Sequence, residues 1–135
     1  MLEYIVFFGL LTAGIVAYIT FNFGEQTENK VFNPRNKCES YIERRLYDAL
    51  ISRGYSVSTQ VWCGKYRIDI ALLGPRIAIE CDGKDYHSSA EQKAHDRRKN
   101  AYLRRHGWKV MRFTGSQING NMRQIITRID KAVSK

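Results

Sequence analysis

Two carboxylates interrupt apolar stretches of this 135-residue sequence and are the first candidates for chemistry. Asp69 lies between two isoleucines, and Glu80 lies between an isoleucine and a cysteine. The segment between them, Leu73-Gly74-Pro75-Arg76, is typical of a short hairpin loop. A hairpin centred on this segment places Asp69 and Glu80 opposite each other, with Cβ atoms ~5 Å apart on one face. Like charges at that separation destabilise a sheet unless a cation binds between them or one carboxyl is protonated.

Carboxylate oxygens with open coordination positions suit Mg²⁺ or Mn²⁺. We therefore expect Asp69 and Glu80 to hold a divalent cation, most simply Mg²⁺, with Mn²⁺ as the other possibility. The alternative is that both carboxylates lie on a solvated outer face of the sheet.

Four further residues could assist such a site. Asp82 shares a face with Glu80 while the strand persists. Lys84 could neutralise a phosphate or polarise a water molecule, and His87 could act as a general base or donate to a phosphate. Glu43 could reach the metal through a water molecule. Three of them have a structural alternative: Lys84 as a solvated surface lysine, His87 as a hydrogen-bonded structural histidine, and Glu43 as the last residue of a helix capping box.

The elements that must position these residues follow from patterning. The capping-box pattern Ser40-Tyr41-Ile42-Glu43 begins a helix that Gly54 ends. A second helix is expected from Ser88 to His106, and an amphipathic helix closes the chain. Four strands are expected at residues 55–62, 66–72, 77–81 and 108–113. The expected order is α-β-β-β-α-β-α, an α/β fold with a mixed sheet.

Charge points to a polyanionic partner. The formal net charge is +9 and falls almost entirely after the first two dozen residues. Basic domains favour nucleic acid or anionic lipid headgroups. The expected second helix has a thin apolar stripe and a wet, positive face that carries Lys93, Arg97, Arg98, Arg104 and Arg105. Asp96 on the same helix is expected to orient His87 or, preferably, to pair with a neighbouring arginine.

The N-terminal segment has a different character. Residues 4–22 carry no charge and are about as long as a bilayer core is thick, so residues 1–23 are expected to be a retained transmembrane anchor. A cleaved signal peptide is the alternative, but no lysine or arginine precedes the apolar run. Residues 24–37 are then a linker and residues 38–135 the folded domain. Basic residues after the anchor place this domain in the cytoplasm, and three cysteines interpreted as reduced fit that location.

Taken together, the motifs resemble a known family. The string Asp69-x(10)-Glu80-Cys81-Asp82-Gly83, with His87 five residues after Asp82, is similar to the PD-(D/E)XK restriction-endonuclease-like superfamily. Within it, the chain is most similar to a domain-of-unknown-function branch near the very-short-patch mismatch-repair endonucleases. Supporting motifs are Ser40-x-x-Glu43-x-x-Leu46, the helix that carries Asp96, and Gly107-Trp108-Lys109-Val110-Met111-Arg112-Phe113.

The resemblance implies a mixed sheet flanked by helices and Mg²⁺-dependent phosphodiester cleavage. The family's metal-binding acids correspond to Asp69 and Glu80, and its first-helix glutamate to Glu43. The superfamily's usual lysine is replaced by Asp82, so Lys84 and His87 are the candidates to substitute for it.

The expected function is a membrane-tethered nuclease that acts on DNA. Asp69 and Glu80, helped by the backbone carbonyl of Cys81, are expected to bind Mg²⁺, and a homodimer is possible. One alternative is a nucleic-acid-binding module of the same fold that lacks catalysis. A second is a membrane-tethered interaction protein whose basic face meets anionic lipid.

Overall fold

The computed structural model describes residues 11–18, 33–83 and 89–134. The chain divides into two compact units, with the division after Phe32. In the first unit, residues 11–18 form a helix with exposed side chains. No helix in the described part of the chain is both long and apolar enough to cross a bilayer. Most of the expected anchor, residues 1–23, lies outside the described residues.

The second unit is built on a four-stranded sheet with the strand order β1-β2-β3-β4. The strands are β1 Ser58–Cys63, β2 Tyr66–Leu72, β3 Ile77–Asp82 and β4 Lys109–Thr114. Strand β2 is antiparallel to both β1 and β3, whereas β4 runs parallel to β3. The mixed sheet expected from the sequence is confirmed, although β1 begins three residues later than expected.

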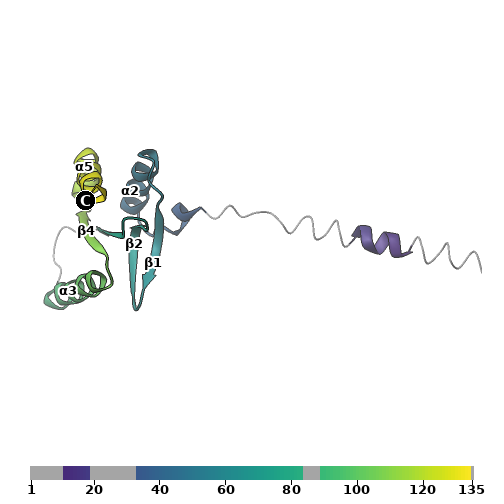
Figure 1. The fold of residues 1–135 in the computed structure, drawn as a ribbon, viewed down its shortest axis with the longest axis horizontal. Helices are drawn as coiled ribbons and strands as arrows, with labels where there is room; N and C mark the ends of the chain where they lie inside the picture. Colours follow the sequence, from purple (N-terminus) through teal and green to yellow (C-terminus); the bar gives the residue numbers. More distant parts are fainter. Residues whose placement is uncertain (1–10, 19–32, 84–88, 135) are drawn as a thin grey trace, which may run out of the picture. The chain divides into compact units, whose positions relative to one another are not determined.

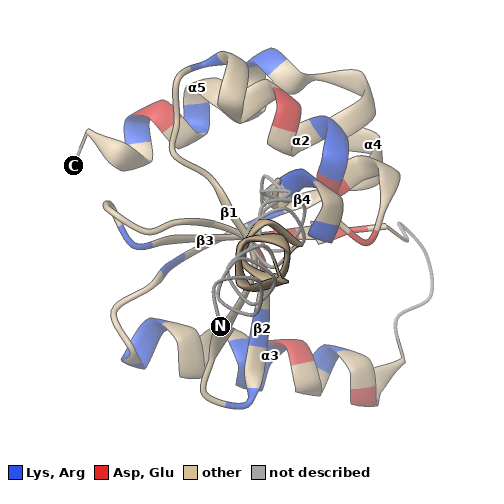
Figure 2. Cartoon of the chain, turned by 90° about the vertical axis from the view of Figure 1, so that its right-hand side faces the viewer, with Lys and Arg blue, Asp and Glu red and all other residues tan. Residues whose placement is uncertain are grey.

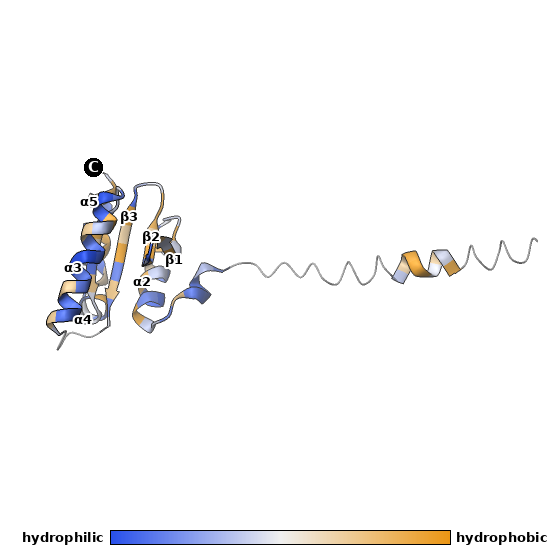
Figure 3. Cartoon of the chain, turned by 90° about the horizontal axis from the view of Figure 1, so that it is seen from below, coloured by the Kyte–Doolittle hydropathy of each residue, from blue (hydrophilic) through white to orange (hydrophobic). Residues whose placement is uncertain are grey.

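Helices cover both faces of this sheet (Figure 1; Figure 2). They are the 3-10 helix η1 Pro34–Lys37 and the α-helices α2 Tyr41–Ser52, α3 Ala90–Arg105, α4 Gly115–Gly120 and α5 Met122–Val133. On one face, α2, α4 and α5 bury the larger core, which includes Leu46, Leu50, Phe113 and Ile129. On the other face, α3 contributes the buried Leu103 to a smaller core. The helix α3 is otherwise largely hydrophilic, as Figure 3 shows.

Three details differ from expectation. Residues 34–37, expected in a linker, form η1 and belong to the folded unit, because Pro34 accepts a hydrogen bond from Thr59 of β1 at 2.5 Å. The cap of α3 is Ser89 rather than Ser88, since the Ser89 hydroxyl accepts from the Gln92 N–H at 3.2 Å. The short helix α4 was not expected, because it begins and ends with glycine, which has a low helix propensity.

Three glycines allow the turn geometry to be tested. Gly64 has a φ of 56°, and an added Cβ would lie 2.1 Å from the Tyr102 hydroxyl. Gly54 has a φ of 91° with open space around it, and Gly74 has open space without a positive φ.

We expect Gly74→Ala to leave the free energy of unfolding nearly unchanged and Gly54→Ala to lower it by about 1 kcal/mol through backbone strain. Gly64→Ala should lower it further, because the strain adds to a steric clash with a packed tyrosine. Urea denaturation of the three variants measures the order, and equal losses for Gly54→Ala and Gly64→Ala would contradict the close approach of Tyr102.

Candidate active site

Asp69 lies where the pairing of β2 with β3 stops. The expected register is confirmed as far as Ile70, which pairs with Ile79. The ladder does not extend to the expected pair of Asp69 and Glu80. Instead, Asp69 Oδ2 accepts a hydrogen bond from the Cys81 N–H at 2.9 Å, so a side chain takes the position that a backbone carbonyl would occupy.

The pairing of β2 with β1 is interrupted at the same residue. The strand pairs pass from Thr59–Ile70 to Val61–Ile68, and the residues between them are Gln60 and Asp69. Gln60 has a φ of 53°, a left-handed conformation that glutamine rarely adopts. Asp69 therefore has no ladder partner among the described strands, and its carboxylate is available for other contacts.

Glu80 projects from β3 toward α3. Its side chain is 5% exposed and forms an ion pair with Lys99 of α3. Burial, followed by the nearby charge of Asp69, raises the pKa of Glu80 to about 7, although Lys99 opposes the shift. Its second carboxylate oxygen, Oε1, is buried without a hydrogen-bond partner among the described residues.

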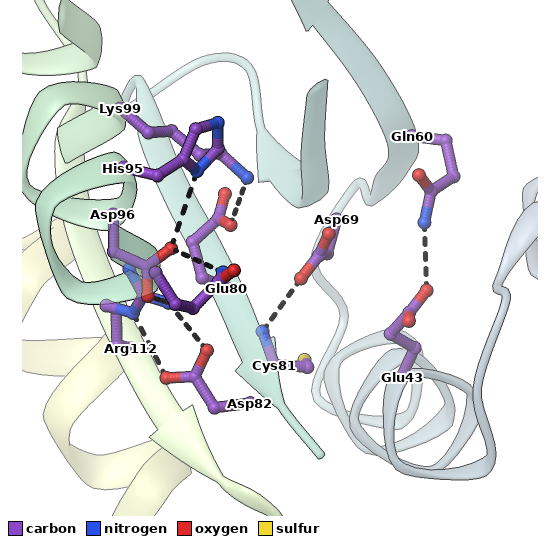
Figure 4. Close-up of polar contacts among 11 residues, drawn as sticks. Glu43, Gln60, Asp69, Glu80, Cys81, Asp82, His95, Asp96, Lys99 and Arg112 are labelled. Atoms are coloured by element: carbon purple, nitrogen blue, oxygen red, sulfur yellow. Dashed lines mark hydrogen bonds and ion pairs between the residues drawn. The ribbon is translucent and has the colours of Figure 1, made fainter. Parts of the chain in front are cut away.

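Asp69 and Glu80 are thus not the directly opposed ladder partners that were expected. Figure 4 shows Glu80 reaching toward Lys99, whereas Asp69 lies between β3 and the helix that carries Glu43. The physical reason is that the ladder of β2 with β3 ends at Ile70 and Ile79, one pair before the two acids. The two acids still interact: the charge of Asp69 contributes to the raised pKa of Glu80. Burial also raises the pKa of Asp69.

Asp82 is fully engaged by an arginine of the neighbouring strand. Its two oxygens accept from Arg112 at 3.0 and 2.6 Å. Arg112 also pairs with Asp96 of α3 at 3.3 Å. Asp96 therefore does pair with an arginine, although one from β4 rather than from its own helix. These contacts give Asp82 a positioning role, since they fasten the end of β3 to β4 and α3.

Glu43 combines its capping role with a contact to the sheet. Its carboxylate accepts from the Ser40 hydroxyl at 2.8 Å and from the Glu39 N–H at 2.9 Å. It also accepts from Gln60 Nε2 at 2.9 Å. Its buried position beside β1 leaves the expected water-mediated metal contact as a prediction.

Lys99 was not among the expected site residues, yet its ammonium is the positive charge in contact with Glu80. Its side chain is only 13% exposed. A signal was present in the sequence: Asp96, Lys99 and Leu103 follow the i, i+3, i+7 spacing of one helix face, and Leu103 is buried. Gln60 and Arg112 were also missed, and nothing in their local sequence distinguishes them.

The remaining expected residues are placed as follows. Lys84 and His87 lie outside the described residues. In the part of the chain that is described, no three histidine, cysteine, aspartate or glutamate side chains are grouped to hold a metal ion. Apart from Lys99, the basic residues of α3 are exposed, and Figure 2 shows their positions in blue along the helix. No described residue forms an ion pair with any of Lys93, Arg97, Arg98, Arg104 and Arg105.

Comparison with known proteins places this geometry in a family. The chain is 31% identical over 90 residues to the uncharacterized protein YcjD of Escherichia coli (strain K12), a match that covers 64% of this chain and 74% of that protein. The fold is similar to the catalytic domain of the homing endonuclease I-Bth0305I, with a TM-score of 0.58 and 22% identity. That match covers 70% of this chain and 94% of the domain.

The family model REase_MTES_1575 matches residues 42–133, which is most of the folded unit. The match spans the helix of Glu43, the Asp69 and Glu80 strands and the basic helix, and it confirms the resemblance to the PD-(D/E)XK superfamily. The chain therefore belongs to the restriction-endonuclease-like family REase_MTES_1575.

Proposed function

We propose that this protein is a divalent-metal-dependent nuclease that hydrolyses phosphodiester bonds in DNA. The observation that carries the proposal is the Asp69 carboxylate, held against the backbone of Cys81 at a point where β2 pairs with neither neighbouring strand of the described sheet. Family membership supports a nuclease-type function. The choice of DNA over RNA rests on the resemblance to mismatch-repair endonucleases.

The described side chains fit a hard divalent cation. Asp69 and Glu80 supply oxygen ligands, which Mg²⁺ and Mn²⁺ prefer. Burial raises the pKa of both carboxyls, so a nearby cation would stabilise their ionised forms. Glu80 Oε1 is buried with no described donor, which leaves a lone pair for a cation. We assign the binding of Mg²⁺, or of Mn²⁺ in its place, to Asp69, Glu80 and the backbone carbonyl of Cys81.

Such a cation would neutralise charge on the scissile phosphate and lower the pKa of an attacking water molecule. In the superfamily, a lysine two residues after the second acid supplies a positive charge. Here Asp82 occupies that position, and Lys99 of α3 supplies the positive charge next to Glu80 instead. Arg112 and Asp82 hold that end of the strand in place. On sequence grounds, His87 or Lys84 is proposed to accept the proton of the water molecule.

The basic helix α3 is proposed to follow the nucleic-acid backbone. Lys99 and Asp96 face the site from this helix, whereas its exposed basic residues carry charges that no described acid neutralises. Phosphate contacts of this kind provide affinity without reading bases. Pairing of two chains, which would allow both strands to be cut, is a further proposal.

A nucleic-acid-binding module without catalysis is the second candidate. The observation that favours it is Asp82, which stands where the superfamily has lysine and is occupied by Arg112. A wild-type chain that binds DNA but shows no cleavage with Mg²⁺ or Mn²⁺, on DNA or RNA, would establish it.

Tethering to a membrane, with the folded unit on the cytoplasmic side, is proposed from the uncharged segment 4–22 alone. Extraction of membranes with alkaline carbonate tests it for the full chain. An anchored chain stays in the membrane pellet, whereas release into the supernatant would contradict a retained anchor.

Asp69→Asn tests the metal site. The amide keeps the size of the carboxylate and an acceptor for the Cys81 N–H, but removes the charge that binds the cation. We expect cleavage with Mg²⁺ to fall at least about a hundredfold, while DNA binding persists. Asp130→Asn is the matched control, since Asp130 contacts Arg53 and Tyr55 at the other side of the domain. Equal cleavage by Asp69→Asn and the wild-type chain would refute the assignment.

Charge removal on α3 tests the nucleic-acid surface. The double variant Arg104→Ala, Arg105→Ala should weaken DNA binding. It should also reduce the magnitude of the slope of log K against log salt concentration, by roughly 1 for every phosphate that the protein no longer neutralises. Arg53→Ala removes a charge that Asp130 already pairs, and it should leave that slope unchanged. The same salt slope in the wild-type chain, the double variant and Arg53→Ala would place the nucleic-acid surface elsewhere. Stronger binding of the wild-type chain to anionic vesicles than to DNA would favour the lipid-binding alternative.

A further inference from the structure

Gln60 occupies a backbone conformation that the fold itself does not require. Its φ of 53° lies in the left-handed region, where a side chain other than that of glycine costs about 1 kcal/mol or more. Strand β1 pairs regularly with β2 on both sides of it. Strained residues inside otherwise regular elements are found preferentially at functional sites.

The strained conformation changes where the side chain points. Thr59 reaches Pro34 of η1, and Gln60 reaches Glu43 of α2, so two consecutive strand residues contact the same helical layer. A regular strand would direct them to opposite faces. Val61 then packs toward the smaller core on the α3 side. The break therefore turns the Gln60 amide away from the α3 side and toward Glu43.

The amide is satisfied at one end only. Gln60 Nε2 donates to the Glu43 carboxylate at 2.9 Å, which fixes the amide with its oxygen turned away from Glu43. That oxygen, Oε1, is buried and has no hydrogen-bond partner in the described part of the chain. A buried polar atom without a partner costs roughly 1–3 kcal/mol. The protein thus maintains two unfavourable features, the strain and the unpaired oxygen, in one residue.

Both features occur opposite Asp69. The flanking pairs of the β1–β2 ladder place Gln60 and Asp69 at facing positions. Figure 4 shows Gln60, Glu43 and Asp69 grouped on the same side of β3, with no basic side chain drawn among them. A neutral amide oxygen adds a hard ligand to such a site without adding another negative charge.

We propose that Gln60 Oε1 is an additional ligand of the divalent cation held by Asp69, and that Glu43 orients the amide for this role. The inference rests on the proposed function, because it names a further ligand of the same site. It accounts for the strained φ, the unpaired oxygen and the contact with Glu43 by one cause. A purely structural Gln60 needs only the contact with Glu43.

Mn²⁺ binding to the full chain, followed by the electron paramagnetic resonance signal of free Mn²⁺, tests the proposal without relying on cleavage. Gln60→Leu removes both ends of the amide and should weaken Mn²⁺ binding at least about tenfold. Trp62→Leu is the control from the same strand, since Trp62 is 67% exposed, and its affinity should equal that of the wild-type chain.

Gln60→Gly guards against a folding defect, because glycine adopts the positive φ without strain. It should keep the thermal unfolding temperature near or above the wild-type value without metal, yet bind Mn²⁺ as weakly as Gln60→Leu. Wild-type affinity in both Gln60 variants, together with lost binding in Asp69→Asn, would overturn the role of Gln60 and leave the proposed function intact. A wild-type chain that binds no Mn²⁺ would overturn both.

Discussion

The interruption of β2 at Asp69 is the constraint on which the rest of the site depends. Strand β2 is central, so its backbone would normally pair on both sides, and a carboxylate there would be confined to the sheet. At Asp69 it pairs on neither side. The Cys81 N–H that the missing pair would satisfy is instead taken by the Asp69 carboxylate at 2.9 Å, which compensates for part of the lost pairing. A rigid sheet can therefore present an acid at a fixed position.

Polar contacts add to apolar packing in holding the second half of the site to the sheet. The helix α3 buries only Leu103 fully, so its attachment draws on Lys99 with Glu80 and on Asp96 with Arg112. Breaking one partner of a buried pair leaves an uncompensated charge, which costs far more than the pair contributes. The ion pairs beside the proposed site thus also position α3, the helix that is proposed to bind the nucleic-acid backbone.

The sequence predicted what depends on periodicity and local caps. The strands of Asp69 and Glu80, the mixed sheet and the final helix from Met122 to Val133 all follow such patterns, and they are observed. It did not predict what depends on a backbone break. Strict alternation and a continuous register make Asp69 and Glu80 a facing pair, whereas the ladder of β2 with β3 ends one pair earlier. Nor could it show which of many basic residues meets Glu80, because only the docking of α3 selects Lys99.

Cys81 lies beside the proposed cation site and bears on which ions that site would accept. Its backbone N–H binds Asp69, while its side chain packs against the larger core. Burial, reinforced by the charge of Asp69, raises the pKa of the Cys81 thiol well above its ordinary value. A protonated thiol is a poor ligand, since thiophilic ions bind the thiolate. The Cys81 thiol therefore adds no soft ligand for ions such as Cu(I) beside the proposed cation site, and alkylating reagents should react slowly with this cysteine.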